Sequence, residues 1–277
     1  MNTKSILITG GNAGIGKAIA VELAKQKYHV VIVSRDAAKG SAALDEIKAA
    51  SKKNTADMII GDLSSIQSTK DLAHNIIKKF PDISILINNA GIWPTKLENN
   101  MDGLEMAFMV NHMAPFILCH MLLPQLIKNK PSRIINVNAE LYPLGKVDIE
   151  KTPYGKDFGM TATYINTKLC NIFFTQRFSE MIQNSGVTVN AVHPGVIRTN
   201  LGIRPGILGS ITKIAKLFFG SPESGAKPPV WLATSPEVAA INGKYFQLFK
   251  QKPYAKNATD LELRDKLWDL SLKLASF

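Results

Sequence analysis

Residues 9–16 read Thr-Gly-Gly-Asn-Ala-Gly-Ile-Gly, and this stretch decides how the rest of the chain is interpreted. An apolar run at Ser5–Thr9 precedes it, and apolar residues at helical spacing follow it. Glycines let a backbone turn tightly and approach a pyrophosphate, and the unpaired N–H groups at the start of the next helix attract that anion. The complete strand–turn–helix context predicts a dinucleotide-binding turn. We expect its cofactor contacts to come from Gly10, Asn12, Gly14, Ile15 and Gly16.

The residues after the second apolar run, Val30–Val33, indicate which dinucleotide is bound. A carboxylate at this point hydrogen-bonds the 2′-hydroxyl of the adenine ribose and repels a 2′-phosphate. Here the chain has Ser34 and Arg35, and the guanidinium fork of an arginine matches a phosphate. Asp36 is better suited to cap the next helix. The sequence therefore predicts NADPH or NADP as the cofactor in preference to NAD.

Short β-branched runs alternate with longer segments of helical periodicity along the whole chain. The expected strands are Ser5–Thr9, Val30–Val33, Met58–Ile60, Ile83–Ile87, Arg133–Val137, Thr188–Val192 and Lys244–Leu248. Several are continuous apolar runs, as in parallel strands buried on both faces. This alternation predicts an α/β fold. We expect a single doubly wound Rossmann domain over residues 1–277, with a parallel sheet of about seven strands flanked by helices.

Composition narrows the class of protein. The net charge is +11, but the lysines are scattered and no arginine-rich helix occurs, so we expect no nucleic-acid partner. The two cysteines lie in apolar helical patterns and are expected to be buried free thiols, and the five histidines show no metal-ligand spacing. No run of 18 apolar residues predicts a membrane span, and the first residues lack a signal-peptide pattern. These features favour a cytoplasmic protein.

Further motifs follow the glycine-rich turn in a fixed order. They are Asp62-Leu63, Asn88-Asn89-Ala90-Gly91, Val110-Asn111, the pair Tyr164 and Lys168, and Pro194-Gly195-Val196 with Thr199. Together they resemble the short-chain dehydrogenase/reductase family over nearly the whole chain, and the stretches from Lys168, Ser185, His193 and Gly243 are similar to its retinol-dehydrogenase-like branch. The resemblance implies further cofactor contacts from Asp62, Leu63, Asn89, Ala90, Gly91, Val110, Tyr164, Lys168, Pro194, Gly195, Val196 and Thr199.

Tyr164 and Lys168 carry the chemistry that the family resemblance implies, with Asn111 as the third catalytic residue. Hydride transfer to a carbonyl leaves an alkoxide that must be protonated, and a phenol has an unperturbed pKa of about 10. A nearby ammonium stabilises the phenolate. Four residues apart on a helix, Tyr164 and Lys168 share one face, so Lys168 can tune Tyr164 and reach the nicotinamide ribose. In the family, Asn111 helps to hold a water that links the lysine to solvent.

The chain departs from the family where the fifth strand ends. The family usually has a serine there whose hydroxyl donates to the substrate carbonyl, and counting from Arg133 places Ala139 in that position. Losing one such donor typically costs ~10²–10³ in rate. Three explanations stay open: Asn138 swings its amide into the place, a hydroxyl such as that of Tyr142 or Thr163 substitutes, or carbonyl reduction is no longer the function. If the ordinary chemistry persists, Ala139→Ser should raise the activity.

The substrate side is expected after Thr199. Residues 200–220 are rich in apolar side chains with interspersed lysines, and the family uses this region as a lid over the nicotinamide. Such a lining suits a lipophilic or aromatic carbonyl compound. The alternatives are a helix packed on its own domain or on a dimer partner, and, with less support, contact with a membrane. We expect Trp93, Asn138, Ala139 and Tyr142 to border the substrate. A homodimer through the long helices is implied by the resemblance alone.

Two functions remain in competition. The first is an NADPH-dependent oxidoreductase that moves a hydride between the nicotinamide and a carbonyl or alcohol of a lipophilic small molecule. The second is an NADP-binding protein of the same fold with a non-redox function, such as a biosynthetic scaffold, an isomerase-like protein or a sensor. Ala139 favours the second, whereas the retention of Asn111, Tyr164 and Lys168 together favours the enzyme.

Overall fold

A computed structural model describes residues 4–51, 56–196 and 220–277. The strands are β1 (Ser5–Thr9), β2 (His29–Ser34), β3 (Ala56–Ile60), β4 (Ile83–Asn88), β5 (Ser132–Val137), β6 (Val187–His193), β7 (Lys244–Gln247) and β8 (Lys250–Lys252). The α-helices are α1 (Gly14–Lys25), α2 (Ala37–Ala50), α3 (Ile66–Lys79), α4 (Met106–Phe108), α5 (Ala114–Lys128), α6 (Met160–Met181), α8 (Pro222–Thr234) and α9 (Leu261–Ala275).

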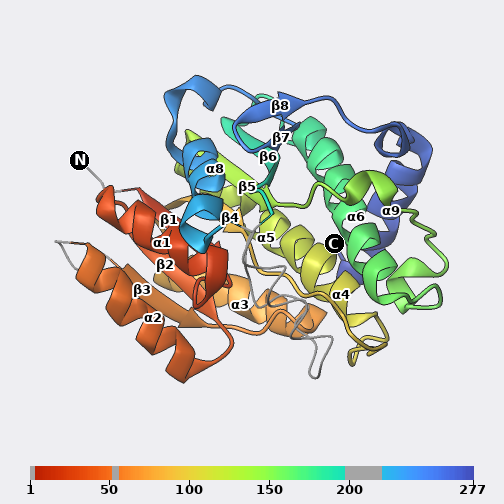
Figure 1. The fold of residues 1–277 in the computed structure, drawn as a ribbon, viewed down its shortest axis with the longest axis horizontal. Coiled ribbons are helices and arrows are strands. Elements are labelled where there is room, and N and C mark those ends of the chain that lie inside the picture. The colour runs from red at the N-terminus through yellow and green to blue at the C-terminus, as the bar shows by residue number, and fades with distance from the viewer. Residues whose placement is uncertain (1–3, 52–55, 197–219) are drawn as a thin grey trace.

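The strands form one twisted sheet in the order β3-β2-β1-β4-β5-β6-β7-β8 (Figure 1). All neighbours are parallel except β7 and β8, which pair antiparallel. This confirms the predicted α/β fold, and the described sheet has eight strands where about seven were expected. The extra strand reads Lys-Gln-Lys and is fully exposed, so it has no apolar pattern by which to predict it. A short lysine-bearing strand is a common way to end a sheet.

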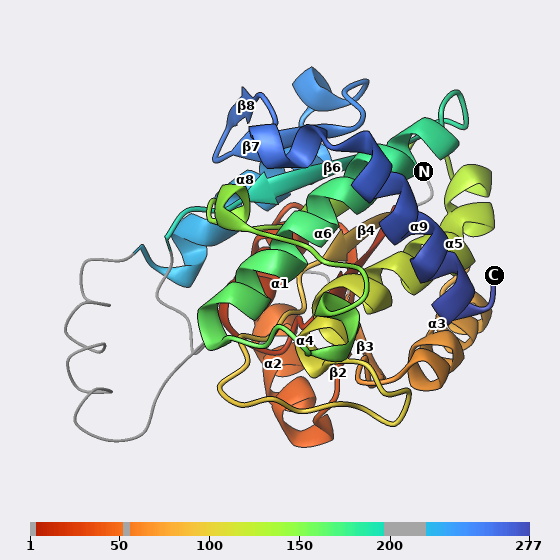
Figure 2. The ribbon, with the colours of Figure 1, turned by 90° about the vertical axis from the view of Figure 1, so that its right-hand side faces the viewer.

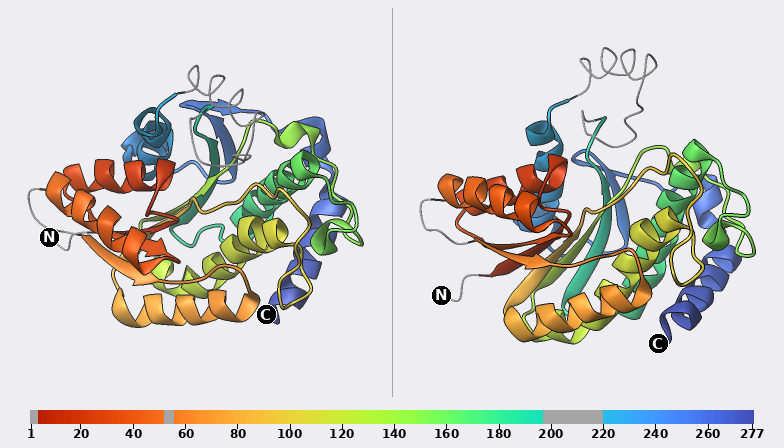
Figure 3. Two further views of the ribbon diagram at one scale, coloured as in Figure 1. Left: turned by 60° about the horizontal axis from the view of Figure 1, so that its bottom comes forward. Right: turned by 90° about the horizontal axis from the view of Figure 1, so that it is seen from below.

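Helices cover both faces of the sheet (Figure 3). On one face α1, α2 and α8 enclose an apolar cluster that includes Ile19, Ile47 and Val230. On the other face α3, α5 and α6 enclose a larger one that includes Leu72, Leu122 and Phe173. The central strands contribute to both clusters, because successive side chains of a strand point to opposite faces. This explains why those strands read as continuous apolar runs.

The order of the strands creates the place for a ligand. From β1 the chain builds outward through β2 and β3, then returns to β4 on the other side of β1. In an open α/β sheet, the crevice at the carboxyl ends of the strands at such a reversal is the usual ligand site. The Gly-rich turn follows β1 and the Asn-Asn-Ala-Gly motif follows β4. The topology therefore brings both motifs to one edge of the sheet.

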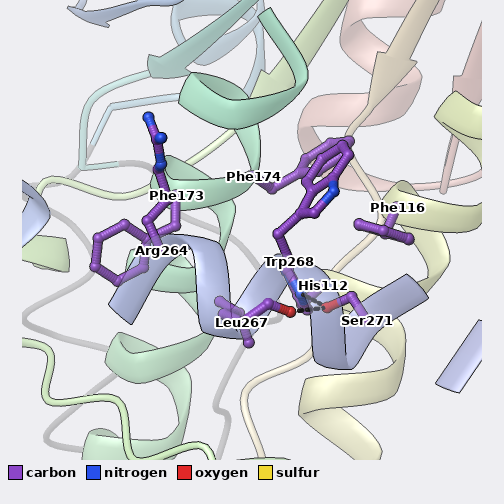
Figure 4. A pocket seen from close by; sticks show the side chains of 8 residues that line it. All are labelled: His112, Phe116, Phe173, Phe174, Arg264, Leu267, Trp268 and Ser271. Carbon is purple, nitrogen blue, oxygen red and sulfur yellow. Dashed lines mark hydrogen bonds between the residues drawn. The ribbon is translucent and has the colours of Figure 1, made fainter. Parts of the chain in front are cut away.

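The C-terminal helix α9 lies across α5 and α6 on the outside of the domain (Figure 2). Trp268 is its anchor, since its ring packs edge-on to Phe116 of α5 and against Phe174 and Phe178 of α6. Figure 4 shows the rings of Phe116, Phe174 and Trp268 with His112, whose Nε2 hydrogen-bonds Ser271 of α9 at 3.0 Å. The pocket among them has no room for a water molecule. The cluster is therefore packing and holds no ligand.

Within the part of the chain that the structure describes, the segment Met106–Lys128 is long and apolar enough by composition to cross a membrane. In the structure 78% of its apolar stretch is buried inside the domain, as expected for a core helix. The expectation that no segment is apolar enough to span a membrane is therefore wrong by composition. In the fold, this apolar surface packs inside the domain. Cys119 and Cys170 are buried free thiols, as expected.

Candidate active site and nucleotide cradle

The Gly-rich turn is held open by its backbone geometry. Gly10 and Gly14 have positive φ angles of 66° and 54°, a region that side chains disfavour. A Cβ atom on Gly16 would lie 2.3 Å from the carbonyl oxygen of Gly10 and 2.4 Å from Nδ2 of Asn89, so only glycine fits. A Cβ atom on Gly14 would meet nothing within 4 Å. The turn is thus tightly packed underneath and open above, as a pyrophosphate requires.

The N-terminus of α1, like those of α5 and α6, has no side-chain cap. Side chains of Asp36, Ser65, Ser221 and Asp260 accept a backbone N–H at the starts of α2, α3, α8 and α9. At α1 the cap is Ala13, which offers no acceptor, and no acidic residue lies in the first turn. Unpaired N–H groups at a helix N-terminus bind anions. The residues present therefore fit the pyrophosphate of a dinucleotide.

Thr9 joins the two motifs. Its Oγ1 accepts hydrogen bonds from the backbone N–H groups of Asn89 and Ala90, both at 3.0 Å. Nδ2 of Asn89 donates back to the carbonyl of Thr9 at 2.9 Å. This reciprocal pairing fixes the Asn-Asn-Ala-Gly turn beside the glycines. Asn89 therefore holds the backbone of both turns in place.

The residues expected around the adenosine lie at the ends of β2 and β3. Arg35 is exposed and makes no hydrogen bond or ion pair within the described residues, so its guanidinium is free for a phosphate. Ser34 is buried and donates to the carbonyl of Asp36 at 2.8 Å, and Asp36 caps α2 as expected. The Asp62 carboxylate accepts from the N–H and hydroxyl of Ser64, at 3.0 and 2.7 Å. That pairing holds the adenine-side carboxylate in a fixed orientation.

Asn111 lies in a π-helical turn, Met109–Met113, between α4 and α5. Pro115 has no N–H to give to the carbonyl four residues earlier, that of Asn111, so the regular helical pattern is broken here. The Asn111 amide accepts from the N–H of Ile92 at 2.8 Å and donates to its carbonyl at 2.9 Å. It also donates to Oγ1 of Thr167 at 3.0 Å. Thr167 was not expected from the sequence, although it directly precedes Lys168.

Tyr164 and Lys168 lie on one face of α6, as their spacing predicts. Nζ of Lys168 is 5.6 Å from the centre of the Tyr164 ring and donates to the carbonyl of Val137 at 3.1 Å. A Cβ atom on Gly91 would come within 3.8 Å of the same Nζ, so the turn after β4 lies against the pair. Burial raises the pKa of Tyr164 to about 12 and lowers that of Lys168 to about 8. The phenol is therefore protonated at neutral pH.

Ala139 stands beside Tyr164 without a polar side chain. Ala139, Tyr164 and Ile165 form one small apolar cluster, on which Trp93 and Leu141 pack. The Trp93 and Tyr164 rings are stacked with their centres 4.2 Å apart and their planes 5° from parallel. The sequence places Trp93 near the substrate but contains no signal for this stacking. Among the residues described, the Tyr164 hydroxyl has no hydrogen-bond partner.

Two of the expected substitutes for the missing serine are directed elsewhere. Asn138 donates through Nδ2 to the carbonyl of Lys168 at 3.1 Å and accepts the N–H of Ala139 through Oδ1 at 2.8 Å. The Tyr142 ring is buried in the main core edge-on to Tyr245, and its hydroxyl accepts from the N–H of Ala255 at 3.0 Å. The expectation that Tyr142 borders the substrate is therefore wrong. Its side chain joins the strand end to the segment before α9.

A cluster that the sequence did not indicate follows directly after Ala139. Oε2 of Glu140 lies 3.5 Å from Nε2 of His193 and accepts from Nε2 of Gln247 at 3.0 Å. Burial lowers the pKa of His193, while the Glu140 carboxylate acts in the opposite direction. These contacts join the ends of β5, β6 and β7. They fix the loop that carries Ala139.

The remaining expected cofactor residues lie around the same edge of the sheet. Gly195 has a positive φ angle of 98°, Pro194 is buried, and Val196 is exposed and accepts from the N–H of Gly220 at 3.0 Å. Thr199 lies outside the described residues, as does the expected lid at 200–220 apart from Gly220. Asn12, Ile15, Leu63 and Val110 are partly exposed next to the motifs already described.

Comparisons with known proteins agree with this geometry. The sequence profile of the short-chain dehydrogenases matches residues 4–204. Human retinol dehydrogenase 13 is 38% identical over 278 residues, covering 98% of this chain and 84% of the relative. A solved structure of a short-chain dehydrogenase from Burkholderia cenocepacia in complex with NADP is 25% identical and superimposes with a TM-score of 0.71, covering 89% of this chain and 96% of the other.

A second solved structure, a protein from Mycobacterium paratuberculosis, is 24% identical and superimposes with a TM-score of 0.78, over 99% of this chain and 93% of the other. It shows the same fold over almost the full length. The sequence profile and the long match to a curated relative go further, because they show the family. The chain is thus an oxidoreductase that belongs to the short-chain dehydrogenase family, in its retinol-dehydrogenase-like branch.

Proposed function

We propose that the protein is an NADPH-dependent oxidoreductase that interconverts a carbonyl and an alcohol on a lipophilic or aromatic small molecule. The observation that carries the proposal is the joint placement of the open Gly-rich turn and the Tyr164–Lys168 face at one edge of the sheet. A relative named as a retinol dehydrogenase and a relative solved in complex with NADP support the substrate class and the cofactor.

The residues that would hold the cofactor run from the turn to α6. The N-terminus of α1 would hold the pyrophosphate and Arg35 would pair with the 2′-phosphate, while Gly91 leaves space beside Lys168 and Asn111. When bound, the nicotinamide supplies or accepts the hydride. An exposed arginine at the end of β2, with no carboxylate there except the helix cap Asp36, supports NADPH in preference to NADH.

In the direction of reduction, the protein must protonate the oxygen that receives negative charge. Because burial keeps the pKa of Tyr164 at about 12, the phenol holds a proton at neutral pH and gives it to that oxygen. Lys168 stabilises the phenolate left behind, and its own pKa of about 8 lets it pass a proton on. Asn111 positions this machinery through Ile92 and Thr167.

The test measures NADPH oxidation against a panel of apolar aldehydes and ketones, with all-trans-retinal among them. Tyr164→Phe should abolish turnover, because the ring stays and the transferable proton is lost. Tyr28→Phe serves as the matched control, since Tyr28 precedes β2 at the opposite end of the strands and should keep full activity. Turnover that survives Tyr164→Phe would refute the mechanism.

One observation favours a second function, NADP binding without redox chemistry. It is the alanine at position 139, which gives the substrate carbonyl no hydroxyl to bind. Under that hypothesis, calorimetry detects tight NADPH binding while no compound of the panel is reduced. Under the oxidoreductase proposal, at least one member of the panel is reduced and Tyr164→Phe stops it.

A further inference from the structure

The site beside Tyr164 needs a second hydrogen-bond donor if it is to reduce carbonyls. Negative charge develops on the carbonyl oxygen, and a preorganised donor aimed at that oxygen is among the larger contributions to catalysis. Ala139 provides a methyl group, packed with Tyr164 and Ile165. The donor must therefore come from another residue that borders the same cluster.

Most of the neighbouring polar groups already make hydrogen bonds within the domain. The N–H of Ala139 donates to Oδ1 of Asn138 at 2.8 Å, and Nδ2 of Asn138 donates to the carbonyl of Lys168 at 3.1 Å. Oγ1 of Thr163 accepts from the N–H of Gly159 at 3.1 Å, in the first turn of α6. Tyr142 lies in the main core. Asn138 cannot turn toward the site without breaking contacts that hold the loop, whereas the Thr163 hydroxyl accepts one hydrogen bond and keeps its own proton to donate.

Trp93 brings a donor group that packs directly on this cluster and on the Tyr164 ring. Its indole is stacked on Tyr164, with the ring centres 4.2 Å apart, and packs on the cluster that contains Ala139. Trp93 is partly exposed, and its indole Nε1 can only donate a hydrogen bond. In the part of the chain that the structure describes, Nε1 of Trp93 has no acceptor. A free donor therefore lies next to the catalytic phenol.

The parallel stacking also suits the geometry. An indole N–H and a phenol O–H both point outward in the planes of their rings, so a stacked pair presents both at its rim. The planes here are only 5° from parallel. The inference requires both groups to lie on the same side of the stacked pair, where one substrate oxygen would accept from Tyr164 and Trp93 together, as an oxygen accepts from a tyrosine and a serine in other members of the family.

We propose that the indole N–H of Trp93 takes the place of the missing serine hydroxyl as the second donor to the substrate oxygen. The inference rests on the proposed oxidoreductase function. In reduction, hydride adds to the carbonyl carbon, the π-bond pair moves to oxygen, and the Trp93 N–H stabilises the developing charge while keeping its proton. Tyr164 then donates its proton to that oxygen, which completes the alcohol.

The decisive variant is Trp93→Phe, which keeps an aromatic ring on Tyr164 and removes only the N–H and one ring. We expect kcat to fall ~10²-fold, the loss typical of one such donor. The dissociation constant for NADPH should stay unchanged, because the expected cofactor contacts of this loop end at Gly91. Trp231→Phe is the matched control, since that indole lies on α8 and donates to Glu237, and it should leave kcat unchanged.

The double variant Trp93→Phe/Ala139→Ser distinguishes a donor from a packing residue. In the Trp93→Phe background, Ala139→Ser should raise kcat at least tenfold. In the wild-type background, the same substitution should raise kcat by less than about threefold. Equal gains in both backgrounds, or an unchanged kcat in Trp93→Phe, overturn the inference and leave the proposed function standing. A wild-type chain that binds NADPH but reduces no carbonyl would refute both the inference and the proposed function.

Discussion

The Gly-rich turn and the corner formed by Tyr164, Lys168 and Trp93 contribute to the site in opposite ways. The turn works by what is absent: no side chain at Gly16, where a Cβ atom would lie 2.3 Å from the Gly10 carbonyl, and no cap at the start of α1. The corner works by what is present: a phenol, an ammonium and an indole brought together from α6 and the loop after β4.

This difference explains why one region keeps the family pattern while the other departs from it. A steric requirement at a glycine has no chemical substitute, because any Cβ atom fills the space. A hydrogen-bond donor can come from any residue whose backbone reaches the same place. We therefore expect substitutions in the turn to be tolerated poorly, and substitutions in the corner to be rescued by a second change nearby.

After Tyr164→Phe, the largest effect in the corner is expected for Lys168→Met. The ammonium that stabilises the Tyr164 phenolate is lost, and acid–base machinery typically contributes ~10²–10⁴-fold to the rate. We expect kcat to fall within that range while the protein stays folded, since a methionine fills a similar volume. Steady-state kinetics and circular dichroism check this. A kcat within tenfold of wild type would exclude Lys168 from the chemistry.

In the turn, Gly16→Ala is expected to weaken NADPH binding about tenfold to hundredfold. The added methyl collides with Gly10 and Asn89, and overpacking of this kind costs about 1–3 kcal/mol. Isothermal titration calorimetry measures the loss. Gly159→Ala is the matched control, because a Cβ atom there makes an ordinary 3.5 Å contact with Ala162. Equal NADPH affinities of the two variants would contradict a nucleotide-binding role of the Gly-rich turn.

A smaller effect is expected at the adenosine end of the turn. Arg35→Ser should lower the ratio of NADPH to NADH affinity by about tenfold, since an exposed charge-assisted hydrogen bond to a phosphate is worth about 1.5 kcal/mol. The effect should weaken at high salt because the side chain is exposed. Fluorescence titration with both cofactors tests it. A ratio that does not change would place the 2′-phosphate elsewhere.

The burial of Lys168 has a consequence for stability. Below pH 8 the folded and unfolded states both carry the proton, and folding bears the cost of burying the ammonium. Between pH 8 and 10.5 the folded protein releases a proton that the unfolded chain keeps, so the free energy of unfolding rises with pH. Through this one group, the free energy of unfolding can rise by at most about 1.4 kcal/mol per pH unit.

Urea titrations between pH 7 and 10 measure this effect, with Lys168→Met as the reference. The wild type should gain stability relative to the variant above pH 8, and the difference should be constant below it. A difference that is constant over the whole range would mean that Lys168 is not an ionised buried group.

The sequence predicts the fold and the cofactor end well, because both depend on local patterns. Seven strands are confirmed to within two residues at each end, and Tyr164 and Lys168 share a face because a helix repeats every 3.6 residues. The corner could be predicted only in part. Whether Tyr142 or Trp93 meets Tyr164 depends on how the loops after β4 and β5 approach α6, and no local periodicity encodes that.

The two cases show the limit directly. Tyr142 is three residues beyond Ala139, yet its ring turns into the core against Tyr245. Trp93 is separated from Tyr164 by a large part of the chain, yet the rings are in contact. Likewise the exposed strand β8 forms because β7 offers it an edge, and its own residues give no apolar signal.

The seating of α9 bears on how the protein behaves at different concentrations. Trp268 and Phe277 cover the outer faces of α5 and α6, the helices through which the resemblance implied pairing. A second molecule would have to displace these aromatic side chains before it could pack against α5 and α6. Each molecule therefore covers this apolar surface with its own C-terminal segment. We expect the specific activity to be the same at nanomolar and micromolar protein concentrations.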